Sequence, residues 1–201
     1  MSIFDVSRSF HRSVGECTEL KDNVFKCKTF SEEYCKDIVD VCEQLSDEFT
    51  ISCPGKPYTV DHLRLEYFGT LFCRQFATVL DNYIIDSITS FYKISQRPGF
   101  SLLDPYIARY SKDTIVDIKE HYDLSTFSII TKLNDDYDGG ELIFPKLDYM
   151  CYNIEVGDSI IFPGSYLYPH MTKPVTSGKK YSLVSFLVQS ELLNAQYCNH
   201  F

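Results

Sequence analysis

Residues 115–134 read IVDIKEHYDLSTFSIITKLN, and this stretch decides the class of fold. It holds two short runs rich in Ile, Val, Phe, Tyr and Thr, 115–122 and 125–133, and it ends at the turn signal Asn134-Asp-Asp. Runs of this length and composition, bounded by turn residues, are typical of short β-strands. The stretch therefore predicts two consecutive strands of a β-rich core.

The same texture continues on both sides of this stretch. Further strands are expected at 105–110, 140–144, 151–154, 158–162 and 180–189. Turn signals such as Asp138-Gly-Gly140 and Pro163-Gly164 separate them. Many short strands with such punctuation favour a β-sandwich or jelly roll.

The part of the chain before Arg97-Pro-Gly99 has helical patterns instead. Thr29-Phe-Ser-Glu32 fits a capping box, and apolar residues follow it at helical spacing as far as Leu45. A second helix is expected from about Thr70 to Tyr92, because its apolar residues form one broad face. The class of fold is therefore α+β, with helices that support a β core.

Length and composition indicate one globular domain. The chain has 201 residues, of which 44% are hydrophobic and 23% charged. We expect a single domain over 1–201, with mainly helical support at 1–100 and the β core at 101–190. No run approaches the roughly 18 apolar residues of a membrane span, and the first residues lack a signal-peptide pattern.

Charge and cysteine usage narrow the class of protein further. The net charge of −9 argues against binding to a nucleic-acid polymer, because phosphates favour a basic face. None of the eight cysteines forms a C-x-x-C pair, so a structural zinc site is not expected. We expect a cytoplasmic protein with reduced thiols, monomeric or homodimeric, and without a membrane partner.

A metal site is the sharpest functional prediction. His121 and Asp123 are two residues apart, so in an extended strand both side chains project to the same side. His170, 47 positions further on (170 − 123), precedes the last strand and supplies a third ligand. Two histidines and one carboxylate form the facial triad of non-haem Fe(II) sites, which leaves positions for a 2-oxo acid and dioxygen. His62 is interpreted as structural or substrate-proximal, and His11 and His200 lie near the chain ends.

A cation is expected to bind the far carboxylate of the 2-oxo acid, because a buried carboxylate requires a charge-assisted partner. Lys180 opens an alternating strand ten positions after His170, and Lys179 points to the opposite face. The hydroxyl of Ser182 or Tyr110 could share the carboxylate. The alternative is that both lysines are ordinary surface charges at a strand end.

Lys132 is a second candidate for this carboxylate. It lies in the middle of the apolar run Ser128-Ile-Ile-Thr-Lys-Leu-Asn134. A lysine inside an apolar strand either extends its ammonium group to water or binds an anion. The sequence leaves the choice between Lys132 and Lys180 open.

These motifs together resemble the catalytic domain of procollagen lysyl hydroxylases, within the wider prolyl-4-hydroxylase-like group of Fe(II)/2-oxoglutarate dioxygenases. The resemblance covers about residues 105–188. It rests on Ala108-Arg-Tyr110, His121-Tyr-Asp-Leu-Ser-Thr-Phe127, Leu133-Asn134, Asp136-Tyr-Asp-Gly-Gly140, Val156-Gly-Asp-Ser-Ile-Ile-Phe-Pro-Gly164 and Pro174-Val-Thr-Ser-Gly-Lys-Lys-Tyr-Ser-Leu-Val-Ser-Phe186.

The resemblance implies a distorted double-stranded β-helix with His121, Asp123 and His170 as metal ligands. Lys180 stands where lysyl hydroxylases usually have Arg, and Lys132 where they have a small residue. The implied cofactors are Fe(II), 2-oxoglutarate and O2, with ascorbate as a candidate accessory reductant.

The activity implied by the resemblance is hydroxylation of an unactivated C–H, on a peptidyl lysine or proline side chain, with succinate and CO2 as co-products. Presence of Asp123 favours hydroxylation over halogenation. One alternative is the same chemistry on a free amino acid, a small metabolite or a nucleobase. The alternative of another class is a non-catalytic β-sandwich binding module.

Overall fold

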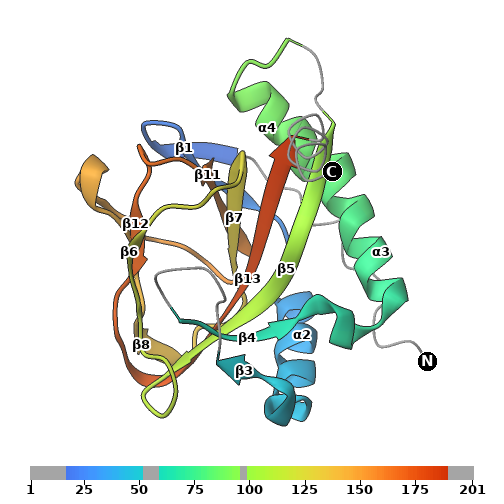
Figure 1. Ribbon diagram of the computed structural model, residues 1–201, viewed down its shortest axis with the longest axis vertical. Helices are drawn as coiled ribbons and strands as arrows, with labels where there is room; N and C mark the ends of the chain where they lie inside the picture. The colour runs from blue at the N-terminus through green and yellow to red at the C-terminus, as the bar shows by residue number, and fades with distance from the viewer. Residues whose placement is uncertain (1–16, 52–58, 96–98, 190–201) are drawn as a thin grey trace, which may run out of the picture.

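The molecule consists of two facing β-sheets with helices packed on the outside of the larger one (Figure 1). The computed structural model describes residues 17–51, 59–95 and 99–189. The main sheet has nine strands in the order β1-β2-β11-β7-β13-β5-β4-β3, with β8 paired to β13, and the small sheet has the order β10-β9-β12-β6. The predicted jelly-roll core of an α+β chain is therefore confirmed.

The described part of the chain has thirteen strands, which are mostly short, and every pairing between them is antiparallel. Their bounds are β1 Cys17–Lys21, β2 Val24–Lys28, β3 Thr50–Ile51, β4 Asp61–Arg64, β5 Phe100–Ser111, β6 Ile118–His121, β7 Phe127–Lys132, β8 Tyr137–Gly139, β9 Leu142–Phe144, β10 Tyr149–Met150, β11 Asp158–Pro163, β12 His170–Thr172 and β13 Val175–Gln189.

Three α-helices cover the outer face of the main sheet: α2 (Glu32–Gln44), α3 (Thr70–Val79) and α4 (Ile85–Phe91). A π-helical turn at Leu80–Ile84 joins α3 to α4, so the predicted long second helix is present with an irregular centre. None of the helices in the described part of the chain is long and apolar enough to cross a lipid bilayer.

The start of α2 differs from the predicted capping box. Ser31 is the N-cap residue, and its hydroxyl accepts a hydrogen bond of 3.2 Å from the Tyr34 backbone N–H. The backbone N–H groups of Thr29 and Phe30 instead donate to the carbonyl of Gly157. The helix therefore starts two residues later than expected, because Thr29 is tied to a distant loop.

Residues 1–100 also contribute strands, beside the helical support that was expected there. Strands β1 to β4 come from this half of the chain and form both ends of the main sheet. They pair with β11 and β5, so their strand character depends on partners far away in sequence. The strand expected at 151–154 is a loop, and the loop at Cys53-Pro-Gly-Lys-Pro57 lies outside the described residues.

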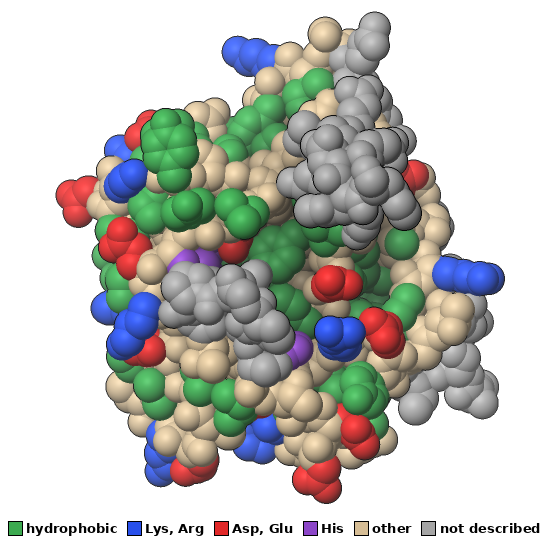
Figure 2. All heavy atoms as spheres, in the orientation of Figure 1, with side chains coloured by type: hydrophobic (Ala, Val, Ile, Leu, Met, Phe, Trp, Pro, Cys, Tyr) green, Lys and Arg blue, Asp and Glu red, His purple; other side chains and the backbone are tan. Residues whose placement is uncertain are grey.

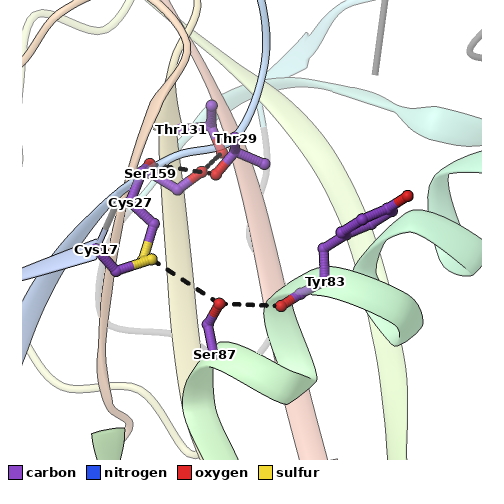
Figure 3. Close-up of a disulfide and its surroundings, with 7 residues drawn as sticks. All are labelled: Cys17, Cys27, Thr29, Tyr83, Ser87, Thr131 and Ser159. Carbon is purple, nitrogen blue, oxygen red and sulfur yellow. Dashed lines mark hydrogen bonds between the residues drawn. A yellow bond between two sulfur atoms is a disulfide. The ribbon is translucent and has the colours of Figure 1, made fainter. Parts of the chain in front are cut away.

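Cys17 and Cys27 form a disulfide across the β1–β2 pair (Figure 3). The expectation of reduced thiols throughout the chain is wrong for this pair. The bond lies against α4, where the Ser87 hydroxyl is 3.8 Å from the Cys17 sulfur and donates to the carbonyl of Tyr83 at 3.0 Å. The remaining described cysteines are free thiols, Cys35, Cys42, Cys73 and Cys151, and Cys53 and Cys198 lie outside the described residues.

The two faces of the main sheet have different surroundings. The outer face packs on the helices through a large apolar cluster that includes Leu63, Ile107 and Leu183. The inner face turns toward the small sheet and carries smaller apolar clusters around Phe162 and Val184. Because side chains alternate along each strand, neighbouring residues of β5, β7 and β13 belong to opposite faces.

Candidate metal centre and adjoining cavity

His121 and His170 lie opposite each other on the paired strands β6 and β12 of the small sheet. Their ring centroids are 4.3 Å apart. Asp123 follows β6 by two residues, and its carboxylate oxygens lie 3.8 Å from Nε2 of His121 and 3.5 Å from Nε2 of His170. The three ligand atoms all lie within 4.8 Å of one another. The structure thus brings the three predicted ligands together.

The ring nitrogens of both histidines are oriented for metal binding. Nδ1 of His121 donates to the Lys119 carbonyl at 2.8 Å, and Nδ1 of His170 donates to the Tyr168 carbonyl at 3.2 Å. A carbonyl only accepts, so each ring carries its proton on Nδ1 and presents the Nε2 lone pair toward Asp123. The three ligand atoms are therefore turned toward one another, as shared coordination of one ion requires.

The carboxylate of Asp123 is held in place by a hydroxyl on β7. The Ser128 hydroxyl donates to Oδ2 of Asp123 at 2.6 Å, and Ser125 Oγ lies 2.8 Å from Ser128 Oγ. All three residues are buried. Ser128 was not among the residues predicted from the sequence, although it is the second residue of β7 and the first polar residue of that strand.

A cavity of about 380 Å³ lies between β7, β9 and β13 on the inner face of the main sheet. Lys180, Lys132 and Ser182 all line it, so three of the four residues predicted to bind the co-substrate share one space. The Ser182 hydroxyl is buried and has no hydrogen-bond partner among the described residues. A buried polar atom without a partner lowers the stability of the fold, because its lost hydrogen bonds to water are not replaced until a ligand supplies a partner.

Lys180 is the buried cation of this cavity. Its Nζ donates to the carbonyl of Gly140 at 2.6 Å and lies 5.1 Å from the ring centroid of Tyr110. Gly140 permits this approach, because a Cβ there would be 3.0 Å from Cδ of Lys180. Burial, with a smaller contribution from Lys132, lowers the pKa of Lys180 to about 8. An anion that replaced lost water contacts would bind such an ammonium group well.

Tyr110, the fourth predicted residue, connects the cavity to the metal centre. Its ring lies beside the Lys180 ammonium group, and its hydroxyl is close to the side chain of Thr172, two residues beyond His170 on β12. Burial raises the pKa of Tyr110 to about 12, so the phenol is neutral at physiological pH. The cavity therefore adjoins the three metal ligands, and its polar groups fit a carboxylate.

Lys132 and Lys179 are placed differently from Lys180. The Lys132 ammonium group forms an ion pair with Asp135 and donates to the Ile154 carbonyl at 2.8 Å. Lys179 points to the outer face, as expected, and pairs with Glu43 on α2. Lys132 thus already has two partners at the edge of the cavity.

His62, the remaining histidine among the described residues, is not part of the triad. His62 lies on β4, with Nδ1 3.4 Å from the Val60 carbonyl and its ring edge-on to Tyr106 at 5.6 Å. His11 and His200 lie outside the described residues. On the face shown in Figure 2, histidine side chains reach the surface among hydrophobic and acidic ones.

Exposed apolar side chains occur within four residues of the metal ligands in sequence. Tyr122 and Leu124 flank Asp123 and are 51% and 90% exposed. Tyr166 and Leu167 precede His170 and are 64% and 54% exposed. Exposed apolar side chains therefore lie on both sides of the metal ligands in sequence.

Comparisons with known proteins agree with this chemistry. The chain is 24% identical over 181 residues to a procollagen lysyl hydroxylase and glycosyltransferase of Acanthamoeba polyphaga mimivirus, which covers 85% of this chain and 20% of that protein. It is 23% identical over 188 residues to the 2-oxoglutarate and iron-dependent oxygenase domain-containing protein 2 of Danio rerio, covering 88% of this chain and 53% of the relative. No family model matches the chain.

The fold has solved counterparts. A viral collagen prolyl hydroxylase from Paramecium bursaria Chlorella virus-1, solved as a 2OG complex, superposes with a TM-score of 0.61 at 16% identity. The match covers 83% of this chain and 96% of that one. The chain spans only about a fifth to a half of the length of the two relatives above. Fold, ligand set and sequence similarity all point to one class of protein.

Proposed function

We propose that this chain is a member of the prolyl-4-hydroxylase-like group of Fe(II)- and 2-oxoglutarate-dependent oxygenases and that it hydroxylates an unactivated C–H bond of a peptidyl lysine or proline side chain. The co-products are succinate and CO2. One observation carries the proposal. The His121, Asp123 and His170 ligand set adjoins a cavity that is lined by a buried ammonium group, Lys180, and an orphaned hydroxyl, Ser182. Both groups are suited to bind an anion.

His121, Asp123 and His170 would hold the iron through two Nε2 atoms and one carboxylate, as the orientation of the rings requires. When bound, iron and 2-oxoglutarate supply the oxidation: dioxygen is split between succinate, formed with loss of CO2, and the substrate C–H. Ser128 keeps the Asp123 carboxylate aligned, and the buried aromatic ring of Phe162, 4.7 Å from that of His170, limits access of water.

We assign the C5 carboxylate of 2-oxoglutarate to Lys180 rather than Lys132. Lys180 is buried and donates to one carbonyl, whereas Lys132 already has an acidic partner in Asp135. Ser182 lies on the same face two residues along β13, so its hydroxyl can donate to the same carboxylate. A lysine binds a carboxylate as a point charge and does not fix its orientation, as the two parallel hydrogen bonds of an arginine would. A hydrogen bond from the Ser182 hydroxyl would fix the orientation instead.

The surroundings of the ligands support a peptide as the substrate. Pockets for small molecules enclose most of the ligand surface. Here the exposed side chains of Tyr122, Leu124, Tyr166 and Leu167 adjoin the metal ligands in sequence and offer an open apolar border. An extended peptide can lie on such a border while one side chain reaches the iron.

The test is turnover by the purified chain with Fe(II), 2-oxoglutarate and ascorbate. We expect succinate release together with a gain of 16 Da on lysine- or proline-containing peptides. His121→Ala and Asp123→Ala abolish both signals, whereas Lys179→Ala, a charge change on the other face of the same strand, leaves both within about twofold.

Two results would change the proposal. An Asp123→Ala protein that releases succinate at the wild-type rate rejects the metal assignment. A gain of 16 Da on free lysine, proline or another metabolite, with none on peptides, transfers the same chemistry to a small-molecule substrate.

A further inference from the structure

We propose that the cavity beside the metal centre has a second anion position, at Lys132, and therefore binds a tricarboxylate in preference to a dicarboxylate of the same chain length. The inference rests on the proposed function for its consequence. A tricarboxylate seated in the cavity would occupy the place of 2-oxoglutarate and inhibit the enzyme.

Two ammonium groups face this one cavity. Lys132 on β7 is the direct cross-strand neighbour of Ser182 on β13, and Lys180 lies two residues along β13 on the same face. Nζ of Lys132 is 5.8 Å and Nζ of Lys180 is 6.0 Å from the ring centroid of Tyr137. Both cations are thus held around one aromatic ring, with the orphaned Ser182 hydroxyl on the same face.

The cavity has room for more than 2-oxoglutarate. Its volume of about 380 Å³ equals that of roughly a dozen liquid water molecules. The ten non-hydrogen atoms of 2-oxoglutarate are bonded to one another and need less space. Moreover, the keto acid end of that molecule binds at the metal, and the three metal ligands do not line this cavity. Space therefore remains beside Lys132 for a further carboxylate.

The acidic residues that also line the cavity have their own partners. Asp138 accepts a hydrogen bond of 2.6 Å from the Ser177 hydroxyl, and Glu141 pairs with Lys173 at 3.8 Å. Asp135 pairs with Lys132, but its side chain is 62% exposed. Exposed ion pairs contribute little stability, so a carboxylate anchored at Lys180 can displace Asp135 from Lys132.

The experiment measures binding to the metal-free protein by calorimetry with two matched ligands. Propane-1,2,3-tricarboxylate is glutarate with one carboxylate added at its central carbon. We expect the wild-type protein to bind the tricarboxylate at least tenfold more tightly, because the added charge gains a charge-assisted contact. Lys132→Met should reduce this preference to about twofold or less, with glutarate affinity unchanged.

Three further variants make the result specific. Lys180→Met should weaken both ligands, and Lys179→Met, the matched charge change on the outer face, should weaken neither. Asp135→Asn should strengthen tricarboxylate binding several-fold, because it frees the Lys132 ammonium group, and should leave glutarate binding unchanged.

Equal affinity for the two ligands in the wild-type protein, or an equal loss for both in Lys132→Met, would overturn the second anion position. The binding assay needs neither iron nor turnover, so its failure is distinct from failure of the proposed function. A chain that prefers the tricarboxylate but releases no succinate would retain the anion position and lose the oxygenase.

Discussion

The two faces of the main sheet differ in how many hydrogen bonds their buried polar side chains form. Along β5 and β13, alternate residues point outward to the helices or inward to the small sheet. Outward-facing Arg109 and Tyr181 have side-chain partners on neighbouring elements. Inward-facing Ser182 has no hydrogen-bond partner in the part of the chain that the structure describes, and Lys180 donates to one carbonyl. The same strands therefore build a stabilising network on one side and a site for a ligand on the other.

The outer network is centred on an ion pair. Arg109 Nε donates to Asp61 Oδ2 at 2.7 Å, and its guanidinium group stacks 4.1 Å from the ring of Phe49. Tyr181 donates to Glu43 on α2 at 2.9 Å. The second oxygen of Asp61 has no hydrogen-bond partner within residues 17–51, 59–95 and 99–189, but the carboxylate as a whole is neutralised by Arg109. These contacts hold β4 and α2 against the rest of the main sheet. Their loss should therefore lower the free energy of unfolding more than it lowers the rate of turnover.

The largest expected effect is on the outer face. Asp61→Ala leaves the guanidinium group of Arg109, 11% exposed, without its counter-ion. We expect the free energy of unfolding to fall by about 3–5 kcal/mol, measured by denaturant titration. Turnover of the folded fraction at saturating 2-oxoglutarate should stay within about twofold. The double change Asp61→Leu with Arg109→Met is the control, and it should recover most of the stability.

The contrast between the outer and inner faces of the main sheet is contradicted if Asp61→Ala lowers turnover and leaves the unfolding curve unchanged. That outcome would mean that the outer network acts on the site rather than on the fold.

The next effect concerns Lys180 and pH. Its pKa is lowered from 10.5 to about 8 by burial, so the unfolded chain binds more protons than the folded chain between these values. Stability of the ligand-free protein should therefore rise as pH increases from about 8 to 10.5, by a contribution on the order of 3 kcal/mol. Lys180→Met should lack this contribution, which the difference between the two unfolding free energies at each pH measures.

The same titration works against ligand binding. Above about pH 8 the amine becomes neutral, so the affinity for 2-oxoglutarate should fall in the wild-type protein. An affinity independent of pH from 7 to 9.5 would argue that another group holds the carboxylate.

A smaller effect is expected at Ser128, which supports a metal ligand. Ser128→Ala removes the 2.6 Å hydrogen bond to Asp123. Metal affinity should fall by roughly 10- to 100-fold, measured by anaerobic titration with Fe(II) or by Co(II) spectroscopy. Ser125→Ala, one hydrogen bond further from Asp123, should have a smaller effect. Equal metal affinities for the wild type and Ser128→Ala would show that the carboxylate needs no such support.

The smallest effect sharpens the contrast between the faces. Ser182→Ala removes an orphaned buried hydroxyl, so the ligand-free protein should be unchanged or more stable by about 1 kcal/mol. Affinity for 2-oxoglutarate should fall several-fold in the same variant. A clear loss of thermal stability without ligand would show that the hydroxyl serves the fold, and the division between the faces would be lost.

The metal ligands were predictable because they depend on alternation. Two residues spaced by one in an extended segment share a side, and this rule predicted that His121 and Asp123 lie together. His121 is the last residue of β6, and Asp123 lies two residues beyond it. The same rule separates Lys180 from Lys179. The choice between Lys180 and Lys132 was not predictable, because it depends on Asp135 and on the carbonyl of Ile154, which only the tertiary structure brings close.

The errors occur where a partner distant in sequence decides the structure. Strand β2 pairs with β11 and strand β4 pairs with β5. The pattern of apolar residues within β2 and β4 does not indicate these distant partners. The disulfide depends on the β1–β2 hairpin, whose turn residues Asp22 and Asn23 both have positive φ. That Asp-Asn pair was a turn signal in the sequence, but eight cysteines leave too many pairings to choose among.

The long strand β13 carries adjacent lysines, Lys179 and Lys180, with opposite orientations. Loss of Tyr181 would shift the preceding residues by one place, while Leu183 and Leu187 kept the rest of the strand seated in the apolar cluster. Lys179 would then turn inward and Lys180 outward. After such a deletion a lysine would still line the cavity, because Lys179 would take the inward position that Lys180 holds in the intact strand.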